Sequence, residues 1–103
     1  MTGFALHPEA FIYLDEIREY IAQDNPDAAD GTIKEIFDGV RTLVAFPHQG
    51  YRRPKLKSRP LRFKLVREYG IACAPDKKPL WVVAVFHGRR NPRVIAAILR
   101  DRE

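Results

Sequence analysis

The chain has 103 residues, a length that suits one hydrophobic core, so we expect a single domain over residues 1–103. With 46% hydrophobic and 30% charged residues, the composition excludes wholesale disorder. The longest apolar run, residues 80–86, is too short to span a bilayer, and the first residues lack the basic and apolar regions of an export signal. We therefore expect a cytoplasmic protein with no membrane partner.

The net charge of +5 is distributed unevenly along the chain. Residues 1–50 hold nine acidic and three basic residues, a net charge of −6, whereas residues 51–103 hold four acidic and fifteen basic residues, a net charge of +11. In one folded domain this asymmetry predicts a strongly positive side, which attracts nucleic acid or an acidic protein. A basic surface that is merely solvated is the alternative.

Cys73 is the one cysteine of the chain, so it cannot form an internal disulfide, which agrees with a reducing compartment. No second cysteine or nearby histidine stands at a metal-binding spacing from it. We interpret Cys73 as a small apolar strand residue, and we expect no metal site and no cofactor.

The first half of the chain predicts a short strand and a helical hairpin. Residues 3–6 have a strand pattern, and residues 7–9 favour a turn into a helix that ends near Gln23. Asn25 is placed to cap a second helix, which Pro26 opens and which ends before Pro47. The apolar stripes that should face the core comprise Phe11, Leu14, Ile17 and Ile21 in the first helix, and Ile33, Ile36, Phe37, Val40, Leu43 and Val44 in the second.

After residue 50 the hydrophobic period becomes strand-like. Residues 61–66 alternate, and residues 69–73 continue beyond a tight connection at residues 68–70, which predicts a β-hairpin. Residues 80–86 are apolar on both faces and should form a central strand, and Asn91-Pro92 should start a last short helix. The predicted fold class is α+β with the order β-α-α-β-β-β-α: a helical hairpin packed on a small, mainly antiparallel sheet, with a short C-terminal helix.

This order of elements, together with several short sequences, resembles the RelE/ParE toxin superfamily. Residues 17–22 (IREYIA), followed by Asn-Pro at 25–26 and Ala-Ala at 28–29, are similar to the helical hairpin of the ParE branch, as is Leu43 followed by residues 46–52 (FPHQGYR). The superfamily's C-terminal signature resembles residues 67–71 (REYGI) with the hydrophobic strand that ends in residues 87–90 (HGRR).

The resemblance implies the toxin component of a type II toxin-antitoxin system, a class that includes plasmid stabilization systems. Such a toxin arrests bacterial growth until a cognate antitoxin neutralises it. The antitoxin wraps the toxin with a largely disordered segment, and an acidic segment would suit the charge asymmetry.

Two molecular targets stay open under this resemblance. The ParE branch inhibits DNA gyrase through protein contacts, and this is the first hypothesis because the hairpin sequence resembles that branch. The RelE branch cleaves mRNA on the ribosome, so the chain would then be an enzyme, a metal-independent endoribonuclease or mRNA interferase. A third possibility is a non-toxic relative that binds a partner or nucleic acid.

A row of basic residues precedes and includes the first strand of the predicted β-hairpin. Because side chains alternate along a strand, Arg62 and Lys64 should share one face, where they can bind phosphates or an acidic partner. An edge strand kept soluble by charge is the alternative. The residues that we expect to bind nucleic acid or a partner are Lys55, Lys57, Arg62, Lys64, Arg89, Arg90 and Arg93.

His87 ends the predicted central strand. If the chain is RelE-like, His87 would be the catalytic acid or base and Arg67 would stabilise charge on the phosphate. Alternatively, His87 is a strand-end residue hydrogen-bonded to the backbone. Catalytic RelE-like members tend to carry a Tyr or His near the C-terminus, and none follows Arg90 here.

Overall fold

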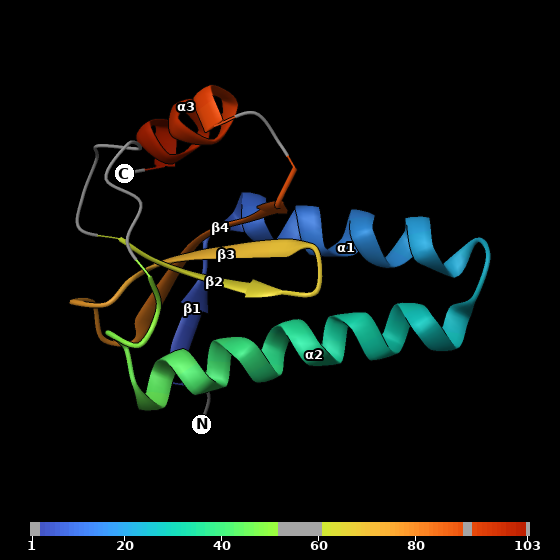
Figure 1. The fold of residues 1–103 in the computed structure, drawn as a ribbon, viewed down its shortest axis with the longest axis horizontal. Helices are drawn as coiled ribbons and strands as arrows, with labels where there is room; N and C mark the ends of the chain where they lie inside the picture. Colours follow the sequence, from blue (N-terminus) through green and yellow to red (C-terminus); the bar gives the residue numbers. More distant parts are fainter. Residues whose placement is uncertain (1–2, 52–60, 90–91, 103) are drawn as a thin grey trace.

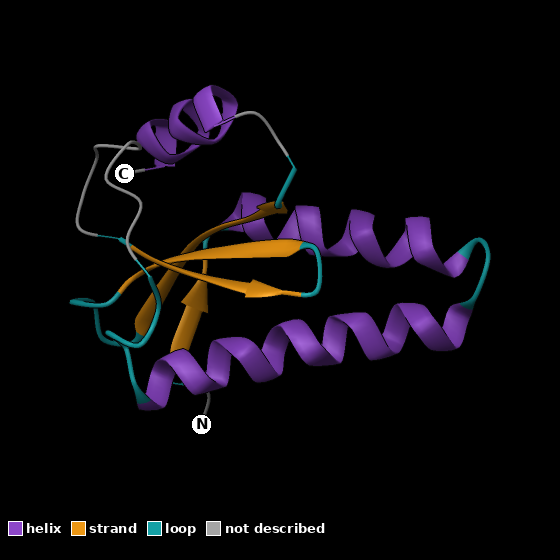
Figure 2. Ribbon diagram, in the orientation of Figure 1, coloured by secondary structure: helices purple, strands orange, loops and turns teal. Residues whose placement is uncertain are grey.

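The computed structural model describes residues 3–51, 61–89 and 92–102. Figure 1 shows a helical hairpin beside a small sheet, with a third helix near the opposite side, and Figure 2 separates helices from strands. The predicted α+β class and the order of elements are confirmed. The elements are β1 (Phe4–Leu6), α1 (Pro8–Ala22), α2 (Pro26–Ala45), β2 (Arg62–Val66), β3 (Tyr69–Ala74), β4 (Leu80–His87) and α3 (Pro92–Arg102).

Both hairpin helices begin at a capping side chain that is followed by proline. The Nδ1 atom of His7 accepts a hydrogen bond from the Glu9 amide at 3.1 Å, and Oδ1 of Asn25 accepts one from the Ala28 amide, also at 3.1 Å. Each cap satisfies an amide that has no partner within its helix. The cap at Asn25 confirms the sequence prediction, and the short turn that it belongs to makes α1 and α2 antiparallel (Figure 1).

The strands form one sheet in the order β1-β4-β3-β2. β1 pairs with β4 in parallel, whereas the β4–β3 and β3–β2 pairs are antiparallel. The predicted central strand is therefore confirmed as β4, and β2 lies at one edge. Because helices cover both faces, the inner strands are apolar on both sides, as a doubly covered sheet requires.

Two hydrophobic clusters lie on opposite faces of this sheet. The cluster under the hairpin is made of Ala10, Leu14, Ile17, Ile36, Val40, Leu43, Tyr69, Ile71, Cys73, Leu80, Val82 and Val85. The cluster under α3 is made of Leu61, Phe63, Ala72, Ala74, Val83, Ala84, Phe86, Ile95 and Leu99. Burial of this apolar area is the main contribution that holds the three layers together.

Three details differ from the sequence predictions. Phe11 is 61% exposed, and Ala10 occupies the buried position of that helical turn. The connection between β2 and β3 consists of Arg67 and Glu68, where Arg67 has a positive φ of 56°, so Tyr69 and Gly70 already belong to β3. β1 begins at Phe4, one residue later than expected.

No helix within the described ranges has the length and apolar character that crossing a membrane requires.

Candidate functional site

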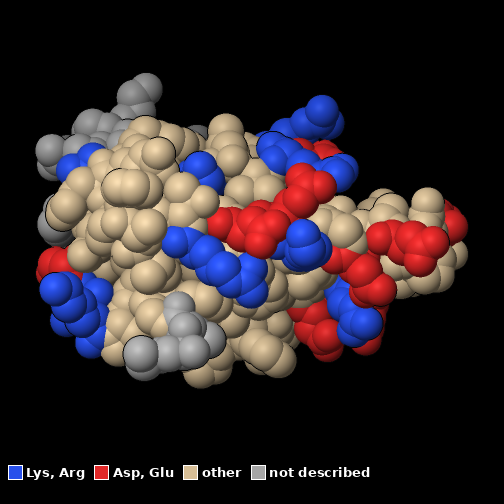
Figure 3. All heavy atoms as spheres, turned by 90° about the horizontal axis from the view of Figure 1, so that it is seen from below, with Lys and Arg blue, Asp and Glu red and all other residues tan. Residues whose placement is uncertain are grey.

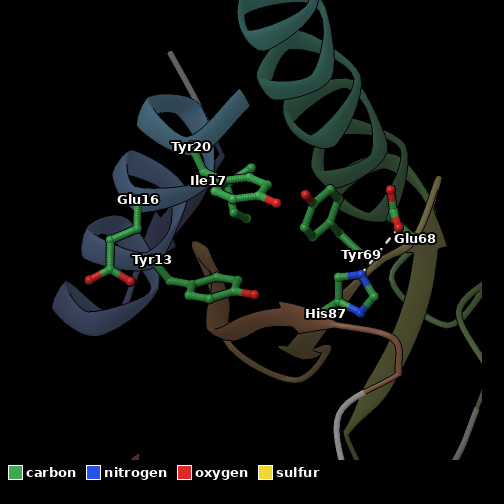
Figure 4. Close-up of a pocket in the computed structure, with 7 residues that line it drawn as sticks. All are labelled: Tyr13, Glu16, Ile17, Tyr20, Glu68, Tyr69 and His87. Atoms are coloured by element: carbon green, nitrogen blue, oxygen red, sulfur yellow. Dashed lines mark hydrogen bonds and ion pairs between the residues drawn. The ribbon is translucent and has the colours of Figure 1, made fainter. Parts of the chain in front are cut away.

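His87 lies beside an open cleft between α1 and the start of β3 (Figure 4). The cleft has a volume of about 480 Å³. Its lining residues come from α1, from the β2–β3 turn and from the ends of two paired strands: Tyr13, Glu16, Ile17, Tyr20, Glu68, Tyr69 and His87.

The spacing of the α1 residues and the sheet register bring these side chains together. Tyr13, Glu16 and Tyr20 stand three to seven residues apart, a spacing that places them on one face of a helix. Tyr69 is the register partner of His87, and their rings meet edge-to-face with centroids 5.6 Å apart and an interplanar angle of 81°. Glu68 enters the cleft because it occupies the turn immediately before Tyr69.

Both ring nitrogens of His87 take part in hydrogen bonds. Nδ1 accepts the backbone N–H of Arg89 at 3.1 Å, and Nε2 lies 3.2 Å from Oε2 of Glu68. Since Nδ1 is the acceptor, the neutral ring that fits both contacts carries its proton on Nε2 and donates it to the Glu68 carboxylate. The backbone contact is the one expected of a strand-end histidine.

Tyr69 has the most buried side chain of the three tyrosines that line the cleft. Its pKa is raised above the ordinary value of 10.0, first because burial disfavours the phenolate, and then because of the Glu68 carboxylate and the Tyr13 and Tyr20 hydroxyls. Tyr69 therefore stays a neutral hydroxyl at physiological pH. Figure 4 shows the same proximity, since the phenol oxygens of the three tyrosines point toward the space between α1 and β3.

Arg67 is bound to the helical hairpin. Its Nε donates to Oε1 of Glu35 at 3.0 Å, and its Nη2 donates to Oε2 of the same carboxylate. This two-point pairing raises the pKa of Arg67 and lowers that of Glu35. The two candidate catalytic residues thus bind different partners: Arg67 contacts α2, whereas His87 contacts Glu68 and Tyr69.

The two basic residues on β2 both lie on the face toward the hairpin. Nη1 of Arg62 donates to the carbonyls of His48 and Gly50 at 3.3 and 3.2 Å, so this guanidinium supports the segment that follows α2. The stem of Lys64 passes α2, because a Cβ built on Gly39 would lie 3.6 Å from its Cε. The shared face confirms the predicted alternation, and it makes Arg62 a structural residue as well as a candidate contact.

The remaining candidate binding residues divide into two groups. Arg89 and Arg93 are exposed: Arg89 lies in the turn that follows β4, and Arg93 lies in the first turn of α3. Lys55, Lys57 and Arg90 lie outside the residues that the structure describes.

The expected positive side is not seen on the face of the hairpin shown in Figure 3. Basic and acidic side chains are intermixed there, and acidic ones predominate toward the hairpin's end. α2 carries such mixed pairs, with Arg41 bound to Asp38 at 2.8 Å and Lys34 bound to the same carboxylate at 3.7 Å. Six of the fifteen basic residues in the second half of the chain fall outside the described part. Five of them lie within residues 52–60, and the sixth is Arg90.

Sequence reasoning named His87 but missed the cleft beside it. A signal was present in α1, where Tyr13, Glu16 and Tyr20 follow helical spacing on a face that also includes the buried Ile17. Their meeting with Glu68 depends on tertiary packing that no local pattern reports. Among the described residues, no group of three or more His, Cys, Asp or Glu side chains is placed to hold a metal ion.

Comparison with known proteins gives one family match. Residues 4–92 match the family described as ParE toxin of type II toxin-antitoxin system, parDE, and these residues include every element from β1 to β4. No individual curated protein matches the chain. The match confirms the resemblance of the hairpin sequence to the ParE branch, and a family of this kind implies a cognate antitoxin as partner. The chain belongs to the ParE toxin family, as the toxin component of a type II toxin-antitoxin system.

Proposed function

We propose that this toxin arrests growth by binding and inhibiting DNA gyrase, and that it does not cleave RNA. The ParE family match supports gyrase inhibition, and the engagement of both His87 nitrogens argues against RNA cleavage. RNA cleavage needs a group that takes the proton of the 2′-hydroxyl, and a nitrogen that already accepts a backbone N–H is poorly placed to do so.

The surroundings of His87 also disfavour an RNA phosphate. The carboxylate of Glu68 lies 3.2 Å from Nε2, so a phosphate that approached this nitrogen would meet a like charge. The cation that would stabilise the phosphorane, Arg67, directs two of its donors to Glu35. Inhibition of gyrase by contact needs none of these groups to transfer a proton.

The antitoxin should be an acidic, partly disordered segment that covers basic side chains at the surface. We propose Lys64, Arg89 and Arg93 as its contacts among the described residues, together with Lys55, Lys57 and Arg90. Charged groups at the rim of such a complex speed association and fix register more than they add affinity.

The test compares wild type with His87→Gln in two assays, DNA supercoiling by gyrase and cleavage of ribosome-bound mRNA. We expect both proteins to inhibit supercoiling equally and to leave mRNA intact. Glutamine keeps a donor for Glu68 but cannot act as a general base, so a nuclease would lose on the order of 100-fold to 10,000-fold in rate. His48→Gln, at a histidine outside the cleft, is the matched control. Cleavage of mRNA by wild type that disappears only in His87→Gln would contradict the proposal.

A further inference from the structure

The cleft beside His87 is rich in hydrogen-bond acceptors. Tyr13, Tyr20 and Tyr69 direct their phenol oxygens toward its interior, and Glu68 adds a carboxylate beside Tyr69, whereas the carboxylate of Glu16, which also lines the cleft, points away from the tyrosine hydroxyls (Figure 4). His87 occupies one carboxylate oxygen of Glu68, and a carboxylate offers about four acceptor sites, so further bonds can form there. An occupant with several donors fits this arrangement.

The charge of the cleft selects a cation. Its described lining includes two carboxylates and neither a lysine nor an arginine. Arg67, which precedes Glu68 in the β2–β3 turn, is held by Glu35 on α2. A guanidinium carries five N–H donors and no acceptor, and it also binds favourably against tyrosine rings.

The cleft is too open to retain a small free cation well. Tyr20 is 74% exposed, and the Glu68 side chain is 61% exposed. A small ion would keep much of its hydration there, whereas a side chain anchored to a polypeptide is positioned by its neighbours. Ile12, which is 54% exposed on the preceding turn of α1, offers such a neighbour an apolar contact.

We infer that this cleft receives an arginine side chain presented by a partner protein. The basic side chain enters between the three tyrosines and pairs with Glu68, while the partner backbone runs across α1. This assignment is independent of the gyrase proposal, since it concerns which side chain the cleft binds and not which process the toxin stops.

The test titrates the full chain with acetyl-Gly-Arg-Gly-amide and follows the tyrosine and His87 ring signals by NMR. We expect shifts confined to Tyr13, Tyr20, Tyr69 and His87 that saturate with a Kd of about 1–10 mM, the range for so small a ligand. The same peptide with citrulline, a neutral analogue of arginine of the same shape, should bind at least about fivefold more weakly.

Three variants assign the binding to the cleft. Tyr20→Ala should weaken binding about two- to fivefold through loss of the ring, whereas Tyr20→Phe should retain most of the ring's contribution. Tyr20 is exposed, so neither change should disturb folding. Glu68→Gln should weaken arginine binding while its amide oxygen still accepts from His87. Glu19→Gln, which removes a carboxylate of α1 that does not line the cleft, should have no effect.

Equal binding of the arginine and citrulline peptides would overturn the inference, because charge would then play no part. Equal weakening by Glu19→Gln and Glu68→Gln would also overturn it, since the peptide would be responding to the acidic hairpin as a whole. Absence of shifts at peptide concentrations above the expected Kd would also overturn it. None of these outcomes bears on gyrase inhibition, which the supercoiling assay measures separately.

Discussion

The ring of Phe86 lies against the backbone of Gly70, its register partner on the neighbouring strand. A Cβ built on Gly70 would stand 2.5 Å from Cε2 and 2.7 Å from Cζ of that ring. Phe86 is 2% exposed and packs edge-to-face on Phe63, with centroids 6.3 Å apart, so the ring has little space to move. The absence of a side chain at residue 70 is therefore a packing requirement of the core under α3.

Gly70→Ala should destabilise the fold by about 1–3 kcal/mol, the usual cost of inserting a methyl group into a filled core. Urea unfolding followed by circular dichroism measures this difference. An unchanged unfolding midpoint would show that the Phe86 ring moves aside more easily than its packing indicates.

Gly31→Ala should have the opposite effect. Gly31 lies inside α2, and a Cβ built there meets no atom within 4 Å. Alanine lowers the conformational entropy of the unfolded chain and favours the helix, so we expect a gain of about 0.5–1 kcal/mol in the free energy of unfolding. The same urea titration provides the measurement, and a loss of stability would reveal a contact of Gly31 that the structure does not contain.

The pair between Arg67 and Glu35 should give stability a dependence on acid pH. Arg67 lowers the pKa of Glu35 from its ordinary value of 4.5, chiefly by hydrogen bonding. A carboxyl group whose pKa is lower in the folded than in the unfolded chain stabilises the fold at pH values above its unfolded pKa. This contribution is lost as the pH falls below about 4.5 and through the folded pKa. Wild type should thus lose more stability than Glu35→Gln between pH 6 and pH 3. Because both side chains are exposed, the difference should be small and should shrink in high salt.

Local signals in the sequence predicted most of the architecture. The Asn25-Pro26 pair located the start of α2, and the doubly apolar run at residues 80–86 located the central strand. The predicted burial of Phe11 was wrong, because residues 10 and 11 both suit a helical stripe and only the packing of α1 on β4 decides which one is buried. Local periodicity cannot make that choice.

The contacts of the candidate site could not be predicted, because they join distant residues. Arg67 and Glu35 stand 32 positions apart, and His87 and Glu68 stand 19 apart. Each pair depends on the hairpin register and on how α2 crosses the sheet. Sequence reasoning therefore named His87 and Arg67 as candidate catalytic residues of a RelE-like site without showing that they bind different partners.

Cys73 should be unreactive in the folded protein. It is fully buried, and burial raises the pKa of its thiol from 9.0 to about 11, with a smaller opposing effect from the charge of Arg62. The thiolate is the reactive species, so this shift alone lowers its fraction about 100-fold at pH 8. Ellman's reagent at pH 8 should label wild type slowly, and quickly once urea unfolds the chain. Rapid labelling without urea would show that β3 opens to solvent.

Lys64→Glu should slow association with the proposed acidic antitoxin, because the side chain at residue 64 would then repel the partner that Lys64 attracts in wild type. At about 10 Å in water one pair of unit charges contributes about 0.4 kcal/mol, so reversal of the charge should change the association rate about fourfold at low salt.

Lys34→Glu is the matched control, since Lys34 belongs to the acidic half and already pairs with Asp38. Lys64 is preferred to Arg62 for this test, because Arg62 also holds the carbonyls of His48 and Gly50 and its loss would disturb the fold. Stopped-flow mixing at several salt concentrations gives both rates. If the two lysine variants associate equally fast, or if the difference persists in high salt, steering by β2 is not the mechanism of antitoxin capture.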